Sequence, residues 1–289
     1  MKKVISIILV LCMVFPFAGC AFAEEAEAAA FTTVKIPFPD DIEDRNSWRT
    51  VARYKDTKEP ITLSMYYNDS VFATIPTENK NREIEAFIPE ELVFTDIDDT
   101  NPDFFNIKQL SRTGVIKGND KGEANINDNV TRAEAVAMIL RFLGLNQVAM
   151  QGTVRIFDDV TSDKWYYREV LSAYNYGLVK GDSEKTFSPE RDVTREEITV
   201  MVVRALQYAG LRCPPREIEN IADADSVSEW AKEAYELIGS NYVSDYDNEN
   251  PESPVRMLNP QKPATRGEVA YILNNTRGVC QMYPSEAAT

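Results

Sequence analysis

The sequence predicts a mainly α-helical fold, in which three helix–loop–helix repeats follow a small antiparallel β module. The tetrapeptide Thr-Arg-x-Glu begins at Thr131, Thr194 and Thr265, with steps of 63 and 71 residues. Each copy stands at the head of an apolar run with helical periodicity. Residues 31–93 instead contain short β-branched and aromatic runs separated by turn residues. A short motif that recurs at a near-fixed step indicates a tandem repeat.

The composition excludes several functions. The 289 residues carry a net charge of −15 and contain no histidine. The negative charge argues against nucleic acid, which is bound through Lys and Arg, and it disfavours attachment to anionic lipid. Without histidine, Ser-His-Asp catalysis, Cys-His catalysis and His-ligated metal sites are excluded. The apolar fraction of 44% is enough for real hydrophobic cores.

Residues 1–23 have the features of a secretory signal peptide. Two lysines precede an apolar stretch, and Ala21-Phe22-Ala23 is a small-x-small cleavage site. We expect cleavage after Ala23, followed by a short linker over residues 24–30. The alternative is a lipoprotein signal with a lipid anchor on Cys20. The apolar stretch is too short to favour spanning a bilayer.

Two cysteines, Cys213 and Cys280, lie beyond the signal. In an exported protein they could form a disulfide that ties the end of the second repeat to the C-terminal tail, residues 277–289. Two unpaired thiols are the alternative, and the sequence does not decide between them.

Residues 31–93 are expected to form the β module as an antiparallel meander. The strand candidates lie between turn residues and are 48–54, 61–67, 71–75 and 84–88. About sixty residues make a marginal core, so we expect this module to lean on the repeats that follow it.

The repeats are expected at residues 94–156, 157–220 and 221–276. Each begins with an apolar residue two positions before an aspartate: Asp96, Asp159 and Asp223. Aromatic residues follow at Phe104, Phe105, Trp165 and Trp230. In the first two repeats the first helix then ends at a glycine-rich stop that includes Gly118 and Gly181. A single pair of short helices cannot bury its apolar stripe, so the three units must pack together.

These features resemble the surface-layer homology (SLH) motif. Repeat two matches nearly throughout, with Gly177-Leu178-Val179-x-Gly181, Phe187-x-Pro189 and Val193-Thr194-Arg195-Glu196-Glu197. Repeat one has Ala124 and Ile126 where the family usually has Phe and Pro. Repeat three keeps Trp230 but lacks the glycine pair and carries an insertion around Tyr246 to Val255. The resemblance covers roughly residues 94–276.

The resemblance implies a fold and a function. Three such motifs are expected to form a pseudo-threefold spindle with a central three-helix bundle. Grooves between its prongs would bind secondary cell-wall polymers attached to peptidoglycan, often carrying a pyruvate ketal. The implied protein is a non-catalytic anchor without cofactors at the cell wall or surface layer, with other surface-layer proteins as further partners.

Two other functions stay open. The repeats could have drifted into a scaffold for protein–protein contacts at the cell surface, displayed from a lipid anchor on Cys20. A carboxylate-based wall hydrolase in the β module is least favoured, because its acidic residues Asp40, Asp41 and Glu43 cluster in a linker-like run.

The Thr and Glu of each tetrapeptide are expected to form a capping box, in which the Thr hydroxyl and the Glu carboxylate satisfy backbone N–H groups at the helix start. The pairs are Thr131 with Glu134, Thr194 with Glu197, and Thr265 with Glu268.

The arginines Arg132, Arg195 and Arg266 are the candidate polymer-binding residues. A guanidinium beside the N–H groups of a helix N-terminus makes a site for a carboxylate, such as a pyruvate ketal. The alternative is a salt bridge to an aspartate of a neighbouring repeat. Binding is favoured for the first two arginines and is evenly weighed for Arg266. Asp96 and Asp159 are included in the candidate polymer-binding set.

The remaining candidates carry two interpretations each. Trp165 and Trp230 would either stack on a sugar or pack within a prong. Gly118 and Gly181 would either let the backbone approach a polymer or cap the first helices. The acidic spacing from Asp245 resembles a calcium loop only faintly and lacks its glycine and bidentate glutamate, so no metal is expected.

Overall fold

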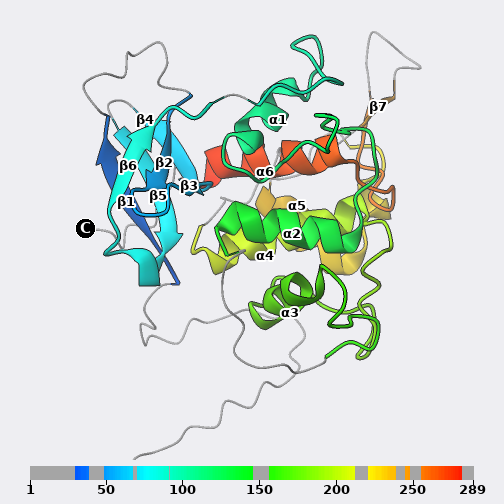
Figure 1. The fold of residues 1–289 in the computed structure, drawn as a ribbon. Coiled ribbons are helices and arrows are strands. Elements are labelled where there is room, and N and C mark those ends of the chain that lie inside the picture. The colour runs from blue at the N-terminus through cyan, green and yellow to red at the C-terminus, as the bar shows by residue number, and fades with distance from the viewer. Residues whose placement is uncertain are drawn as a thin grey trace, which may run out of the picture.

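The computed structural model describes the chain between Ala30 and Gln281, with gaps (Figure 1). The described residues are 30–38, 49–67, 70–90, 92–145, 156–211, 221–238, 245–247 and 255–281. Outside them lie the expected signal peptide, Cys20, Cys213, the acidic run that contains Asp40, Asp41 and Glu43, and the tail beyond residue 281.

The β module contains two antiparallel sheets of three strands. The first has the order β1-β5-β4 and consists of β1 (Phe31–Pro37), β4 (Ser64–Tyr67) and β5 (Ser70–Pro76). The second has the order β3-β2-β6 and consists of β2 (Val51–Tyr54), β3 (Pro60–Ile61) and β6 (Ile84–Phe87). A 3₁₀ turn, η2 (Thr77–Asn79), follows β5. Alternation buries Val71, Ala73 and Ile75 of β5 completely.

This module is packed against the helices. Phe31 and Leu63 are buried in the same core as the helical residues. The ring of Phe31 meets the ring of Tyr208 edge-on, with 5.8 Å between centroids. The Thr62 hydroxyl donates to the Arg141 carbonyl at 3.2 Å. The β module therefore packs against the repeats, as expected for a module of this small size.

Helix pairs follow the β module, as the sequence predicts. The first helices of the repeats are α1 (Phe104–Ser111), α3 (Tyr167–Asn175) and α5 (Glu229–Ile238), the last preceded by a 3₁₀ turn η3 (Ala224–Ser226). The second helices are α2 (Arg132–Leu143), α4 (Arg195–Tyr208) and α6 (Arg266–Gln281). Their wide apolar faces are deeply buried; in α4, Ile198, Val202 and Leu206 are at most 2% exposed.

A short hairpin flanks the insertion in repeat three. Its strands, β7 (Asp245–Asp247) and β8 (Val255–Met257), pair antiparallel. The sequence predicts an insertion without the glycine pair in this region and no strands. The strands of three residues each are too short for alternation to reveal them.

Each first helix packs against the second helix of another repeat. Helix α3 packs on α2, α5 on α4, and α1 on α6, while α4 also contacts both α2 and α6 (Figure 1). The repeats are thus interlocked in a cycle, with repeat one closing onto repeat three.

Backbone hydrogen bonds follow the same cycle. The first N–H of α2, from Arg132, donates to the Arg191 carbonyl at 2.8 Å. The first N–H of α4 donates to Lys262 at 3.0 Å, and that of α6 donates to Asp128 at 3.0 Å. Each second helix therefore satisfies its N-terminal donors with the loop of the next repeat. The expected open helix N-terminus for an anion is wrong, because these N–H groups already have carbonyl partners.

None of the helices in the described ranges is long and apolar enough to cross a membrane.

Candidate functional site

The Thr and Glu of the tetrapeptide form capping boxes at all three second helices. The backbone N–H of Thr131 donates to Glu134 at 2.8 Å, that of Thr194 to Glu197 at 2.9 Å, and that of Thr265 to Glu268 at 3.0 Å. The Thr hydroxyls accept in return from the backbone N–H groups of the three glutamates, each at 3.3 Å. These residues fix where the helices begin.

Arg132 points into protein rather than solvent. Its side chain is 4% exposed and its Nη1 donates to Glu197 Oε1 at 3.0 Å. It also donates to the carbonyls of Phe187 and Lys180, at 3.0 and 3.1 Å. Burial lowers the pKa of Arg132, and the nearby charges of Glu197 and Asp182 oppose that shift. The Arg132 guanidinium is therefore hydrogen-bonded to groups of the second repeat.

Arg195 occupies the equivalent position one repeat further and is enclosed even more fully. Its side chain is 1% exposed; its Nη2 donates to Asp245 at 2.8 Å and to Glu268 at 2.5 Å. Burial acts against its charge, but the hydrogen bonds to the two carboxylates raise its pKa. The Asp245 carboxylate also accepts from Asn259 and Lys262. The Asp245 carboxylate is therefore part of an ion-pair network with Arg195 and Lys262.

For these two arginines the structure shows the salt bridge that the sequence left as the alternative, with different partners. The cap glutamate of the following repeat takes the place of the expected aspartate. The aspartates near the start of each repeat instead accept hydrogen bonds from the loop backbone of their own repeat. Asp96 accepts from the N–H groups of Ala124 and Asn125, Asp159 from Phe187 and Ser188, and Asp223 from Leu258 and Asn259, at 2.6–2.9 Å for the shortest bonds.

These hydrogen bonds hold one residue of each loop in a rare backbone conformation. Asn125, Ser188 and Asn259 all have positive φ, between 46° and 57°. Non-glycine residues adopt this region only when their surroundings impose it. The oxygen atoms of Asp96 and Asp159 are therefore engaged in shaping the loops.

Arg266 differs from its two equivalents. Its Nη2 donates to the Lys117 carbonyl at 2.9 Å, and it makes no ion pair with any residue that the structure describes. It lines a cavity of about 230 Å³ together with Gly118, Asn119 and Glu134. Burial lowers the pKa of Arg266, and the charge of Glu134 partly offsets this shift. The cavity thus contains a charged guanidinium with free hydrogen-bonding capacity.

One neighbouring residue contributes to the difference. Asp182 follows Gly181 in repeat two and lies 3.5 Å from the Arg132 guanidinium. The matching position after Gly118 is Asn119, which has no charge to offer Arg266. The difference is visible in the sequence as Lys-Gly-Asn in repeat one against Lys-Gly-Asp in repeat two.

The predicted glycines have separate roles. Gly118 lines the cavity beside Arg266. A Cβ at Gly181 would lie 2.5 Å from the Phe157 ring and 2.7 Å from the Thr186 carbonyl, so packing requires glycine there. Neither residue caps a helix with positive φ; Gly114 and Gly177 do so, at 74° and 71°.

The aromatic residues are exposed at equivalent places in the three repeats. Phe105, Trp165 and Trp230 are 55–57% exposed. Trp165 packs edge-on against Tyr166, with 5.4 Å between centroids. Their outer faces are accessible to a ligand, but none of them lines the cavity beside Arg266.

The expected disulfide falls outside what the structure describes. Cys213 lies in an undescribed range, and Cys280 belongs to α6 without a described side chain.

Comparison with known proteins identifies the repeats. The model of the S-layer homology domain family matches residues 93–136, 156–199 and 220–270. The Surface-layer 125 kDa protein of Lysinibacillus sphaericus is 31% identical over 170 residues, which are 59% of this chain and 14% of that protein. An Endoglucanase of Bacillus sp. (strain KSM-635) is 28% identical over 215 residues, 74% of this chain and 21% of that protein.

A third relative is the Middle cell wall protein of Brevibacillus brevis, 34% identical over 125 residues, 43% of this chain and 12% of that protein. The chain therefore spans about a fifth or less of the length of these three relatives.

Proposed function

Because this chain carries three tandem S-layer homology motifs, we propose that it anchors itself non-covalently to a secondary polymer of the bacterial cell wall. Its location is the cell wall or cell surface, outside the compartment of synthesis, as for relatives named for the surface layer and the cell wall. We assign it a binding role and no catalytic one.

The observation that carries the proposal is the open cavity beside Arg266. An arginine can bind a carboxylate through two parallel hydrogen bonds, and this one has no acidic partner among the described residues. A polymer acid group, such as a pyruvate ketal, would supply that partner. Gly118 also lines this cavity.

The acidic residues of this cavity suit a sugar more than a simple anion. Glu134 accepts from the Thr131 backbone and hydroxyl, and Glu123 accepts from Asn119 at 2.7 Å. Asp128 also lines the cavity. Carboxylates accept hydrogen bonds from hydroxyl groups, so a hydroxyl-rich unit with one acid group fits this mixture.

The cyclic helix packing supports a pseudo-threefold spindle with α2, α4 and α6 as its central bundle. We propose the division into a signal (1–23), a linker (24–30), the β module (31–93), three repeats (94–156, 157–220 and 221–276) and a tail (277–289).

In this proposal the predicted residues divide into two groups. Arg266 and Gly118 bind the polymer, and the exposed Trp165 and Trp230 offer stacking faces near the prongs. Arg132, Arg195, Asp96, Asp159 and Gly181 hold the framework that presents them.

A scaffold for protein–protein contacts is the second candidate. It is favoured by the enclosure of Arg132 and Arg195, since two of the three motif arginines are closed to a ligand.

Sedimentation with purified cell walls tests the proposal. The protein should pellet with intact walls and stay in solution with walls from which hydrofluoric acid has removed phosphodiester-linked polymer. Arg266→Gln should weaken pelleting about tenfold, since a hydrogen bond to a charged group contributes about 1.5–3 kcal/mol. Arg168→Gln, an exposed arginine on α3, is the matched control and should pellet like the unaltered protein.

Equal pelleting with intact and stripped walls would contradict polymer binding and favour the scaffold. A protein that pellets normally with Arg266→Gln would move the site away from this cavity.

A further inference from the structure

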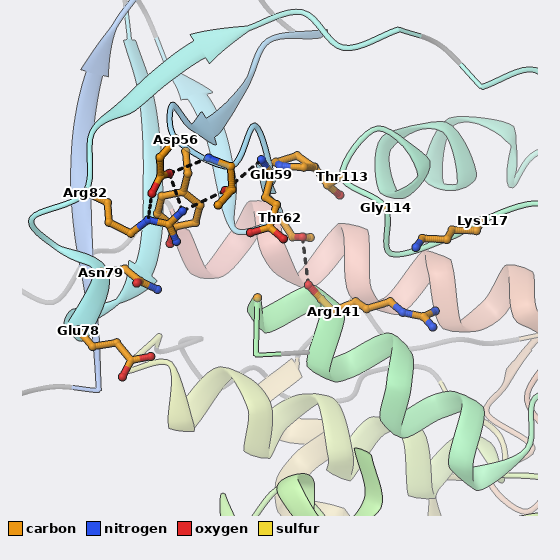
Figure 2. Close-up of a pocket in the computed structure, with 14 residues that line it drawn as sticks. Asp56, Glu59, Thr62, Glu78, Asn79, Arg82, Thr113, Gly114, Lys117 and Arg141 are labelled. Atoms are coloured by element: carbon orange, nitrogen blue, oxygen red, sulfur yellow. Dashed lines mark hydrogen bonds and ion pairs between the residues drawn. The ribbon is translucent and has the colours of Figure 1, made fainter. Parts of the chain in front are cut away.

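A larger cavity lies between the β module and the first repeat. Its volume is about 660 Å³, and Figure 2 shows side chains of both parts around it. The wall formed by the first repeat, the helical wall, carries Lys117 and Arg141. Lys117 lies in the loop that follows α1, and Arg141 lies in the last turn of α2. Lys117 lines the smaller cavity beside Arg266 as well. The two cavities are therefore adjacent, and Lys117 lines both of them.

The β-module wall of this cavity contains an ion pair and a cation–π contact. Arg82 donates to both oxygens of Asp56, at 2.6 and 3.1 Å. Its guanidinium lies 3.7 Å from the ring centroid of Tyr54, which it covers. Asn79 from η2 hydrogen-bonds the Tyr54 side chain and also lines the cavity. Arg82, Asp56 and Tyr54 are thus already in contact with one another in the free protein.

The helical wall holds cations without acidic partners. Lys117 and Arg141 make no ion pair within the described part of the chain, although the sequence has 46 acidic against 31 basic residues. Figure 2 shows both side chains in the right half of the view, opposite Arg82 and Asp56. Arg141 is also near enough to Arg266 for its charge to lower the pKa of that residue. Three neighbouring like charges favour an anion among them.

The opposite wall is acidic and polar. It presents Asp56, Glu59, Glu78, Thr57 and Asn79, together with Arg82, which pairs with Asp56. Such groups repel a bare anion but accept and donate hydrogen bonds with hydroxyls. The two walls together complement a ligand that has acid groups on one edge and hydroxyl groups on the other.

We propose that this cavity is a second saccharide subsite, which binds further acidic units of the same wall polymer. The polymer would run from Arg266, past Lys117, to Arg141 and the β-module wall. The inference rests on the proposed function and adds to it a role for the β module as one half of an extended binding groove.

Binding of size-fractionated polymer tests the inference. Fragments of one repeating unit and of several units are released from the wall, and their affinities are measured by isothermal titration calorimetry with the full mature chain. The longer fragments should bind more tightly to the unaltered protein. Arg141→Gln should lose about tenfold in affinity for the longer fragments and keep its affinity for the single unit.

Two further variants provide a second test and a control. Lys117→Gln removes an exposed cation between the cavities and should weaken long fragments more than short ones. Lys121→Gln, on the same loop but outside both cavities, is the charge-matched control and should bind like the unaltered protein.

Equal affinity for short and long fragments, or equal losses in Arg141→Gln and Lys121→Gln, would overturn the extended groove and leave the anchoring function standing. Absence of binding by fragments of either length would overturn both.

Discussion

The arginine of the repeated tetrapeptide has the same place in the sequence three times but two different environments. Asp182 and Asp245 help to enclose Arg132 and Arg195, whereas Asn119 leaves Arg266 open. The sequence predicted that these arginines matter and that a salt bridge was the alternative. It favoured binding at Arg132 and Arg195 over Arg266, the reverse of the order in which the structure leaves them open, because the deciding neighbours come from other repeats.

Removing an enclosed arginine should destabilise the protein. Arg195→Gln leaves Glu268 and Asp245 without their shared cation, and because both carboxylates are partly exposed the loss should be about 2–3 kcal/mol. Arg266→Gln loses one hydrogen bond to a carbonyl and should cost about 1 kcal/mol. Urea denaturation of the two variants measures the difference, and similar losses for both would contradict the distinction.

Supplying the missing acid should close the open cavity. Asn119→Asp places a carboxylate where Asp182 stands in repeat two, and Glu123→Gln in the same chain removes a repelling neighbour. The double variant should lose pelleting with intact walls because Arg266 gains an internal partner. Glu123→Gln alone should pellet normally, and normal pelleting of the double variant would refute the explanation.

The ion-pair network should make stability depend on pH in the acid range. Burial raises the pKa of Glu197, but hydrogen bonds from Arg191 and the Thr194 backbone outweigh it and lower the pKa below 4.5. The Arg195 guanidinium likewise holds the pKa of Asp245 below 3.8. A carboxyl with a lowered folded-state pKa stabilises the protein above its unfolded-state pKa, and this contribution is lost as the pH falls toward the folded-state value.

Urea denaturation between pH 7 and pH 3 checks this. The free energy of unfolding should stay level near neutrality and fall below about pH 4.5. Glu197→Gln should be less stable at pH 7 and should show a shallower fall in acid. An unchanged acid slope in that variant would refute the assignment.

At the scale of elements, local sequence predicted the second helices well and their partners poorly. The capping boxes mark the starts of α2, α4 and α6, because Thr and Glu act within one helical turn. The cyclic pairing of first helices with second helices of other repeats is not visible in periodicity, which shows an apolar face but not what covers it. The β7–β8 hairpin was missed for its shortness.

Loss of a cap should have a moderate and local cost. Thr194→Ala removes the hydroxyl that accepts from the Glu197 backbone and should lower the free energy of unfolding by about 1 kcal/mol. Ser162→Ala, an exposed residue outside any helix, is the control and should change stability little. Thermal and chemical denaturation give the comparison, and equal effects would contradict the capping role.

At the scale of the whole molecule, the β module and the repeats share one core. Leu63 from the module is 1% exposed and belongs to the cluster that contains the buried helical residues. The sequence predicted that the module would lean on the repeats, since sixty residues hold little core of their own. It gave no sign that the junction would enclose a cavity, because the lining residues are far apart in the chain.

A shared core predicts cooperative unfolding. Leu63→Ala should cost about 2–5 kcal/mol and shift a single calorimetric transition for the whole chain. Ala52→Gly, in the smaller core inside the β module, is a comparison for damage confined to that module. A separate early transition in Leu63→Ala would show that the module unfolds independently.

The cycle of backbone hydrogen bonds also restricts how such a protein can evolve. In an open stack of repeats, a duplicated unit lengthens the array and finds a ready neighbour at either end. Here the loop of repeat one already receives the N–H groups of α6, so no terminal acceptor remains for a fourth copy. Gene duplication would therefore multiply whole closed triplets, and the loss of one repeat would open the ring.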